Sequence, residues 1–259
     1  MNLEWAQKIA RQNIIATYMD TARGVAETQV SREDGFVWCH SEQEASFANM
    51  ILGFHEPQSV WSMKQALERT SKGRYLPRAF VIPGDEPKML EQILTTSGYG
   101  WNHDQDIWVY QNEDDFFAKE PKSTVRVCEN DAEKDEVIGM MLHEFFAHRS
   151  HQYRELVRQA TLFAGSKFYS ATIDGKMIGS AMVKITEESA GIYNLCIDPM
   201  HRHSGFGSEI VAKIVEDAIS EEKVPTLQCD EPLGDFYRQQ NFIKVGKLRC
   251  FVAFRQKLR

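Results

Sequence analysis

The segment from residue 197 to residue 210, IDPMHRHSGFGSEI, contains residue types that can hold an anion. An apolar stretch breaks at Asp198-Pro199 into a charged run, glycines follow at 205 and 207, and a helical pattern begins. The first amide N–H groups of a helix are unpaired and lie at the positive end of the helix dipole, so such a turn can hold a phosphate. Glycine adds no Cβ that would keep a pyrophosphate away from the backbone. The turn therefore predicts an anion site.

Two familiar phosphate motifs do not fit this segment. Gly207 is followed by Ser-Glu rather than by Lys and Ser or Thr, so the segment is not a P-loop. Only one Gly-x-Gly is present, so it is not a dinucleotide fingerprint either. A tight turn that needs glycine for structural reasons alone stays an alternative.

The arginine at position 202 extends the pattern to Arg-x-x-Gly-x-Gly, directly after a strand that ends in LCIDP. This pattern resembles the acetyl-CoA pyrophosphate loop of the GCN5-related N-acetyltransferases, the GNAT family. The resemblance covers about residues 124 to 255. It includes DFYRQQNF, which is similar to the family's Leu-Tyr-x-x-x-Gly-Phe segment, with Tyr237 at the tyrosine position and Asn241 in place of the glycine.

The resemblance implies how acetyl-CoA is bound. Main-chain amides from about His203 to Ser208 would hold the pyrophosphate, and the strand before the loop would pair with the pantetheine arm and orient the acetyl carbonyl. Irregular backbone is expected from Asn194 to Ile197, where that strand separates from its neighbour. The implied cofactor-binding residues are Leu195, Cys196, Ile197, Arg202, His203, Ser204, Gly205, Phe206, Gly207 and Ser208.

Acetyl transfer to an amine needs a neutral nucleophile, stabilisation of the oxyanion and a proton for the leaving thiolate. By the resemblance, Tyr237 is the catalytic residue that supplies this proton. The alternative is that its ring packs in the short helix and its hydroxyl only makes a hydrogen bond. The sequence does not identify the base that takes a proton from the amine. The candidates are Glu144, Glu231 and Asn194, the last acting through a bound water. Glu231 stands where family members often have asparagine, and its role is also open.

A histidine-rich stretch, HEFFAHRSHQYRE, is a weak candidate for a metal site. His143 and His148 are five residues apart, whereas two ligands on one helix face need a spacing of three or four. We therefore expect no metal. In the resembled family this region forms the substrate side of the cleft. Some side chains of this stretch could contact the acceptor, or the stretch could be a solvated helix face. The side chains in question are His148, Arg149, His151, Tyr153 and Arg154.

The elements that must position these residues divide at about 112–123, where acidic and lysine-rich residues precede Pro121. After it we expect strands at 124–129, 167–174, 175–185, 189–197 and 225–229, helices at 131–148, 150–160, 204–220 and 233–240, and a final strand pair in 243–255. Asp174-Gly175 predicts a two-residue hairpin turn. Before the divide we expect helices at 3–20, 59–72 and 86–97, and strands at 35–40, 78–83 and 106–111.

Composition limits the class of protein. The 259 residues are 42% hydrophobic and 26% charged, typical of a globular protein, and no apolar run approaches a membrane span. We expect a cytoplasmic protein. Five scattered cysteines predict reduced, buried thiols. Residues 1–120 carry 11 Lys and Arg against 18 Asp and Glu, which argues against a nucleic-acid partner.

Together with these elements, the resemblance to the GNAT family implies an α/β (α+β) protein of two acetyltransferase-like domains, each a mixed, mostly antiparallel twisted sheet flanked by helices. Residues 119–259 would be the catalytic domain, and residues 1–118 a degenerate copy, whose end near Gly98-Tyr99 resembles the end of such a domain. The expected activity is transfer from acetyl-CoA to the primary amine of a small molecule, by a monomer or homodimer. A non-catalytic acyl-CoA sensor or interaction module and a protein N-acetyltransferase are the alternatives.

Overall fold

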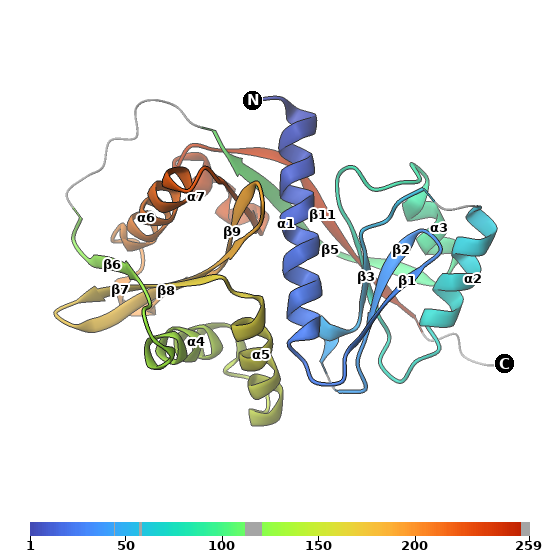
Figure 1. The fold of residues 1–259 in the computed structure, drawn as a ribbon, viewed down its shortest axis with the longest axis horizontal. Coiled ribbons are helices and arrows are strands. Elements are labelled where there is room, and N and C mark those ends of the chain that lie inside the picture. The colour runs from blue at the N-terminus through green and yellow to red at the C-terminus, as the bar shows by residue number, and fades with distance from the viewer. Residues whose placement is uncertain (44, 57–58, 112–120, 255–259) are drawn as a thin grey trace.

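The computed structural model describes residues 1–43, 45–56, 59–111 and 121–254 (Figure 1). The predicted boundary between residues 118 and 119, and most of the predicted linker, lie outside these residues. We call residues 1–111 the N-terminal half. Its elements are α1 (Leu3–Arg23), β1 (Gln29–Glu33), β2 (Phe36–His40), the 3-10 turn η1 (Ser46–Ala48), β3 (Met50–Leu52), α2 (Val60–Thr70), β4 (Arg78–Val81), α3 (Leu90–Thr96) and β5 (Tyr99–Tyr110).

Residues 121–254 form the C-terminal half, in which the cofactor motif lies. Its elements are β6 (Thr124–Val127), α4 (Asp131–Phe146), α5 (His151–Ala164), β7 (Lys167–Ile173), β8 (Lys176–Ile185), β9 (Ser189–Ile197), η2 (Pro199–His201), α6 (Phe206–Ser220), β10 (Val224–Cys229), η3 (Glu231–Leu233), α7 (Gly234–Arg238) and β11 (Phe242–Ala253). The predicted hairpin between β7 and β8 is present, with positive φ at Asp174 and Gly175.

The eleven strands of the described residues form one sheet, in the order β1-β2-β3-β4-β11-β5-β10-β9-β8-β7-β6. Two pairs are parallel, β3 with β4 and β9 with β10, and the others are antiparallel. Helix α2 connects the first parallel pair and α6 the second. The predicted fold class, mixed and mostly antiparallel sheets flanked by helices, is confirmed, and the two expected sheets are continuous with each other.

The continuity comes from the last strand of each half. β5 lies between β10 and β11, and β11 lies between β4 and β5. The final strand of the N-terminal half therefore pairs with β10 of the C-terminal half, and β11 pairs with β4 of the N-terminal half. We call β5 and β11 the exchanged strands. They also pair with each other, from Phe242 opposite Tyr110 to Ala253 opposite Tyr99.

Helix α1 stands in the middle of the molecule, between the elements of the two halves (Figure 1). The side chain of Asn2 caps it by accepting a hydrogen bond from the amide of Glu4 at 2.9 Å. Its buried residues recur at helical spacing and join a core on the sheet face that includes Ile107 and Val109 of β5. Trp108 and Tyr110 of the same strand point to the core beneath α6. The exchanged strand β5 therefore contributes to the cores of both halves.

The structure corrects several sequence expectations. β11 is a single strand rather than the expected final pair, β5 begins at Tyr99 rather than at residue 106, and the short strands β1 and β3 were not expected. β1 and the first part of β5 carry exposed polar residues, so the apolar pattern does not mark them. All five cysteines are free and buried, as predicted.

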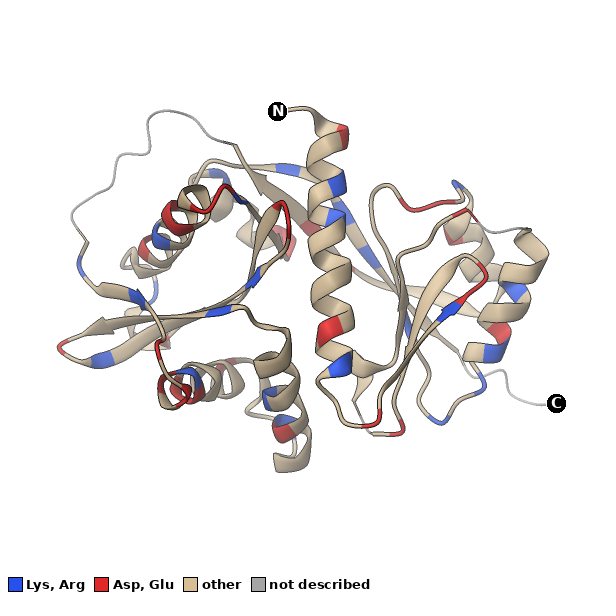
Figure 2. Cartoon of the chain, viewed as in Figure 1, with Lys and Arg blue, Asp and Glu red and all other residues tan. Residues whose placement is uncertain are grey.

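Charged side chains are spread over the helices and loops of both halves (Figure 2). Part of the predicted acidic excess, Glu113, Asp114, Asp115 and Glu120, lies outside the described residues. Within α1, no charged residue occurs from Gln12 to Met19. Across the described residues, none of the helices has the length and apolar character needed to cross a membrane.

Candidate active site

The two parallel strands β9 and β10 separate at one end. Their pairing runs from Ser189 opposite Val224 to Ile192 opposite Leu227 and stops there. On the other side of β9, the register with β8 shifts after Ser180, and Asn194 has a φ of 52°, which marks a bulge. The irregular backbone expected from Asn194 to Ile197 is thus found at Asn194. The strands leave an opening between them, which we call the β9–β10 opening.

The glycine turn follows the outer end of β9. Gly205 has a φ of 97° and is the N-cap of α6, and a Cβ built at this position meets no atom within 4 Å. The amide of Glu209 donates to the carbonyl of Gly205, so the amides of residues 206–208 precede the first hydrogen bond of the helix. Lys122 Nζ donates to the carbonyl of Ser204 at 3.3 Å and adds a positive charge beside the turn. Free amides, open space and a nearby cation fit an anion.

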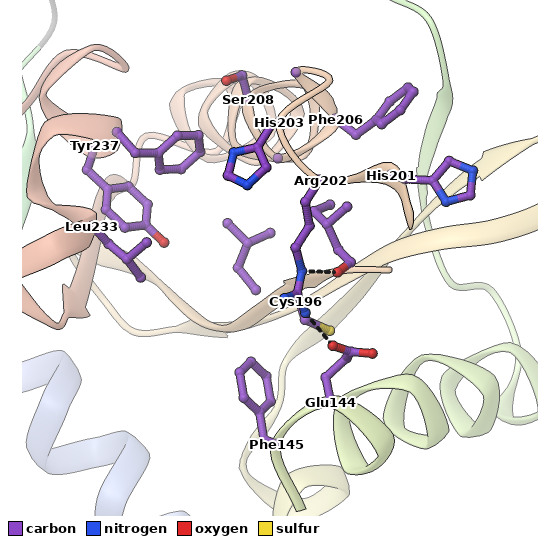
Figure 3. Close-up of a pocket in the computed structure, with 15 residues that line it drawn as sticks. Glu144, Phe145, Cys196, His201, Arg202, His203, Phe206, Ser208, Leu233 and Tyr237 are labelled. Carbon is purple, nitrogen blue, oxygen red and sulfur yellow. Dashed lines mark hydrogen bonds and ion pairs between the residues drawn. The ribbon is translucent and has the colours of Figure 1, made fainter. Parts of the chain in front are cut away.

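A cavity of about 540 Å³ joins the turn to the β9–β10 opening (Figure 3). Ten of the eleven predicted site residues line it, and Ser204 is the exception. They are Leu195, Cys196, Ile197, Arg202, His203, Gly205, Phe206, Gly207, Ser208 and Tyr237. Glu144, considered as a base, also lines the cavity. Sequence reasoning missed four lining residues: Phe145, His201, Leu233 and Phe236. Leu233 and Phe236 lie close to Tyr237 in the chain, which is the signal that could have found them.

Arg202 lies at the cavity wall, with its side chain 49% exposed and its guanidinium held by two contacts. Its Nε donates to the carbonyl of Ile197 at 3.0 Å, and its Nη2 contacts Glu144 Oε2 at 2.5 Å (Figure 3). The Glu144 side chain is only 9% exposed. The pair therefore ties α4 to the end of β9, and Glu144 would have to leave Arg202 before it could accept a proton from an amine.

Tyr237 is fixed by aromatic neighbours. Its ring packs against Phe236 at 4.9 Å and against Phe242 at 6.0 Å, both at steep interplanar angles. Its hydroxyl points into the cavity (Figure 3) and makes no hydrogen bond with any described residue. Burial raises the pKa of Tyr237 above that of a free phenol, with Cys229 as a smaller cause. The residue is thus a neutral proton donor with a free hydroxyl.

The cysteines near the cavity are not activated thiols. Burial raises the pKa of Cys196 to about 11, and burial also raises the pKa of Cys229 to about 11. A reactive cysteine needs a lowered pKa, because the thiolate is the nucleophile. Neither thiol is therefore activated as a nucleophile.

The histidine-rich stretch lies at the junction of α4 and α5. His143, His148 and His151 are exposed. Tyr153 packs edge-on against Phe47 of the N-terminal half at 5.7 Å. The Nε atom of Arg154 is buried and has no hydrogen-bond partner. In the part of the chain that the structure describes, no three His, Cys, Asp or Glu side chains gather as metal ligands would.

Comparison with known proteins identifies a family for the segment that contains the cavity residues. Residues 141–242, from within α4 to the start of β11, match the model described as "Acetyltransferase (GNAT) family". Residues 141–242 belong to the GNAT acetyltransferase family. The expected resemblance is thereby confirmed for this segment, and the GNAT assignment supports an acyltransferase. GNAT enzymes in general take the acyl group from acetyl-CoA, which suits the cavity described above.

Solved GNAT structures share the fold over most of the chain. A GCN5-related N-acetyltransferase from Kribbella flavida is 15% identical with a TM-score of 0.73, over 98% of this chain and 97% of that one. A tandem GNAT protein from the clavulanic acid biosynthesis pathway is 13% identical with a TM-score of 0.63, over 88% and 84%. A GNAT protein from Sphaerobacter thermophilus is 11% identical with a TM-score of 0.58, over 85% and 80%. No curated protein matches the sequence.

Proposed function

We propose that the C-terminal half transfers the acetyl group of acetyl-CoA directly to a primary amine of a small molecule. The observation that carries the proposal is the single cavity that joins the β9–β10 opening, the turn at Gly205 and the free hydroxyl of Tyr237. When bound there, acetyl-CoA supplies an activated thioester. The protein has only to bind, orient and exchange protons.

The outer end of the cavity suits the pyrophosphate. The amides of residues 206–208 are unpaired at the N-terminus of a 15-residue helix, and Gly205 leaves the approach open. Main-chain groups of Leu195, Cys196 and Ile197 would pair with the pantetheine arm, as an added strand pairs with a sheet edge. In this proposal the thioester lies toward the inner end of the β9–β10 opening.

Tyr237 acts on the leaving group. As the amine nitrogen forms its bond to the carbonyl carbon, the carbon–sulfur bond breaks and the thiolate takes the proton of the phenol. The amine gives up one proton to a base or to water, and a proton returned through water restores Tyr237. Among the candidates for the base, Glu231 and Asn194 are exposed, whereas Glu144 lines the cavity and is paired with Arg202.

The first test is calorimetric titration of the full chain with acetyl-CoA and with CoA. We expect both to bind the native protein. The Gly205→Glu variant, which brings a carboxylate to the phosphate site, should lose about 100-fold in affinity, because like charges brought together cost several kcal/mol.

Gly175→Glu is the matched control. Gly175 is exposed, has a φ of 76° and has no atom within 4 Å of a built Cβ, so the variant adds the same charge and similar backbone strain far from the cavity. It should bind acetyl-CoA as the native protein does. If the native protein binds neither nucleotide, both the transferase and the acyl-CoA sensor are wrong. If binding occurs but no amine is acetylated, the sensor is favoured; turnover with peptides alone favours a protein acetyltransferase.

A further inference from the structure

A chain of polar side chains crosses the inner end of the β9–β10 opening. Tyr193 and Gln228 are the first residues beyond the last paired residues of β9 and β10. Gln228 Nε2 donates to the hydroxyl of Tyr193 at 3.4 Å, at the long end of hydrogen-bond distance. Side chains therefore connect the two strands at the point where their backbones separate.

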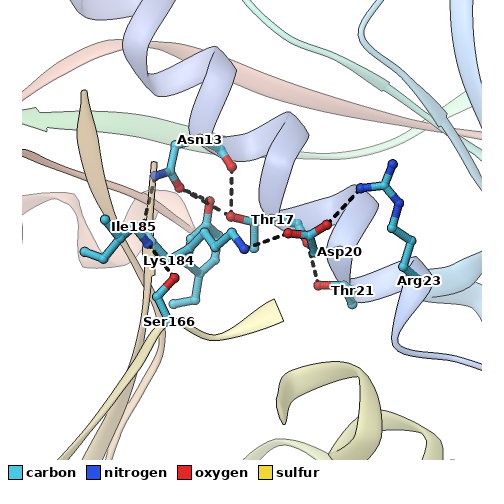
Figure 4. A network of polar contacts seen from close by, with 9 residues as sticks. Asn13, Thr17, Asp20, Thr21, Arg23, Ser166, Lys184 and Ile185 are labelled. Atoms are coloured by element: carbon cyan, nitrogen blue, oxygen red, sulfur yellow. Dashed lines mark hydrogen bonds and ion pairs between the residues drawn. The ribbon is translucent and has the colours of Figure 1, made fainter. Parts of the chain in front are cut away.

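The hydroxyl of Tyr193 is held from the other side by the N-terminal half. It donates to Asn13 Oδ1 of α1 at 2.9 Å. Asn13 is fully buried, and its Nδ2 donates to the carbonyl of Lys184 at 3.1 Å and to Ser189 Oγ at 3.0 Å. Figure 4 shows Asn13 reaching from α1 toward Lys184. Because every polar group of Asn13 has a partner, the amide is fixed in one orientation.

The chain of contacts depends on a close approach of α1 to the sheet. A Cβ built on Gly191 would lie 2.0 Å from Asn13 Oδ1 and 2.6 Å from Tyr193 Cε2. Only glycine leaves room there for both side chains. The stretch of α1 from Gln12 to Met19 carries no charged residue. The charges beside it are paired, because Lys184 Nζ contacts Asp20 Oδ2 at 2.6 Å.

We propose that Asn13, Tyr193 and Gln228, which we call the crossbar, set the length of the acyl group that the enzyme accepts. The inference rests on the proposed function, in which the pantetheine arm enters from the turn at Gly205 and its acyl end points inward. Tyr193 lies two residues beyond Leu195, the innermost residue of β9 that lines the cavity. An acyl chain longer than acetyl would meet the crossbar. The Tyr193 hydroxyl bonds to Asn13 on one side and to Gln228 on the other, which fixes the ring.

This inference gives the N-terminal half a part in donor selection. Asn13 would act as a positioning residue, because it touches Tyr193 and not the acyl group. Burial raises the pKa of Tyr193 to about 12, so its hydroxyl stays neutral and keeps both hydrogen bonds across the physiological range.

The test compares the affinities of the full chain for acetyl-, propionyl-, butyryl- and hexanoyl-CoA by calorimetry, which needs no acceptor. For the native protein, affinity should fall roughly tenfold or more from acetyl to butyryl, since one methylene too many in a fitted pocket costs about that much. Tyr193→Ala should bind acetyl-CoA within about threefold of the native affinity and remove most of the preference over butyryl-CoA.

Further variants separate the effect of positioning Tyr193 from that of the contact between Tyr193 and the acyl chain. Asn13→Ala keeps the ring of Tyr193 but removes the hydrogen bond that holds its hydroxyl. This variant should weaken the chain-length preference by a smaller factor than Tyr193→Ala does. Thr21→Ala is its control on α1, because the hydroxyl of Thr21 bonds only to the carbonyl of Thr17 within the helix. Thr21→Ala should keep the native preference. Gln228→Ala removes the other arm of the crossbar and carries the test if Tyr193→Ala does not fold.

The outcomes distinguish this inference from the proposed function. A native protein that binds neither acetyl-CoA nor CoA overturns both. A native protein that binds acetyl- and butyryl-CoA equally, or folded Tyr193→Ala and Gln228→Ala variants that keep the native preference, overturns the crossbar alone.

Discussion

The residue with the sharpest chemical role is Tyr237. Its ring is packed on two sides, its hydroxyl is free in the cavity and its pKa is raised by burial, so it is protonated at every pH at which the enzyme would work. A phenol buried for structural reasons alone usually has a hydrogen-bond partner. The absence of one among the described residues favours a partner that arrives with the substrate.

Replacing Tyr237 by phenylalanine tests this role. We expect kcat to fall by about 100-fold or more, the usual contribution of a general acid, while the affinity for acetyl-CoA changes little. The measurement is steady-state thiol release with an amine acceptor found by screening. Tyr169→Phe is the control, because the hydroxyl of Tyr169 bonds to Asp217 and does not line the cavity. An unchanged kcat in Tyr237→Phe would show that the hydroxyl donates no proton in the limiting step.

Sequence reasoning reached the residues of the turn but not their interactions. The motif Arg-x-x-Gly-x-Gly locates the loop because glycine is favoured where φ is large and positive, and Gly205 has a φ of 97°. The bond of Arg202 to Glu144 could not be predicted, because the two residues are far apart in the sequence and only folding brings α4 to the end of β9. Phe145, next to Glu144, was missed for the same reason, whereas His201 directly precedes Arg202 and could have been found from the motif.

At the scale of elements, the two parallel pairs of strands differ in what lies beyond them. Past β3 and β4, Arg11 Nη2 donates to the carbonyl of Phe54 at 2.9 Å, and Asp85 accepts from the amide of Ile82 at 2.8 Å. Arg11 and Asp85 are themselves paired at 2.7 Å. An ion pair thus joins the segments that follow β3 and β4, where the C-terminal half has its opening.

The ion pair has a measurable pH dependence. Burial raises the pKa of Asp85 to about 6, against the effect of its hydrogen bond to Ile82 and of Arg11. Because the folded chain binds this proton more tightly than the unfolded chain, protonation stabilises the fold. The contribution is complete below about pH 4 and is lost as the pH rises through 6.

The Asp85→Asn variant cannot ionise at this position, so it should not lose this stability as the pH rises. We expect the free energy of unfolding of the native chain to fall by about 2–3 kcal/mol between pH 4 and pH 6 relative to the variant, as two pKa units imply. Urea titrations of both proteins at each pH give the comparison. Parallel pH profiles would show that Asp85 ionises in the folded chain as readily as in the unfolded one.

At the scale of the whole molecule, the exchanged strands make the two halves depend on each other. Without the N-terminal half, β11 loses both of its neighbours, β4 and β5, and β10 loses β5. The cavity would lose its support, since Tyr237 lies between β10 and β11 in the chain and packs against Phe242.

Splitting the chain after residue 118 tests this dependence. Residues 1–118 and 119–259, produced together, should purify as a one-to-one complex that binds acetyl-CoA as the intact chain does. Residues 119–259 produced alone should fail to give a folded monomer, because two unpaired strand edges are exposed. Size-exclusion chromatography and calorimetry decide the outcome. A folded, monomeric fragment with native affinity would mean that the site needs neither β5 nor the pairing of β11 with β4.

The order of elements was predictable, whereas their partners were not. Periodicity located most helices and strands, and the turn at Asp174-Gly175 paired β7 with β8, because these signals are local. No pattern in the sequence near β5 indicates that it pairs with β10 and β11, which lie more than a hundred residues away. This pairing depends on how the strand packs against two cores.

The double membership of β5 also constrains how the gene can change. Ile107 and Val109 face one core and Trp108 and Tyr110 face the other, so inserting or deleting one codon just before Ile107 would turn all four side chains to the wrong face. Such a change in β1, at the far edge of the sheet, would disturb one strand pair only. Length variation among descendants of this sequence should therefore be rarest in β5 and β11, although neither strand contributes a residue to the cavity lining.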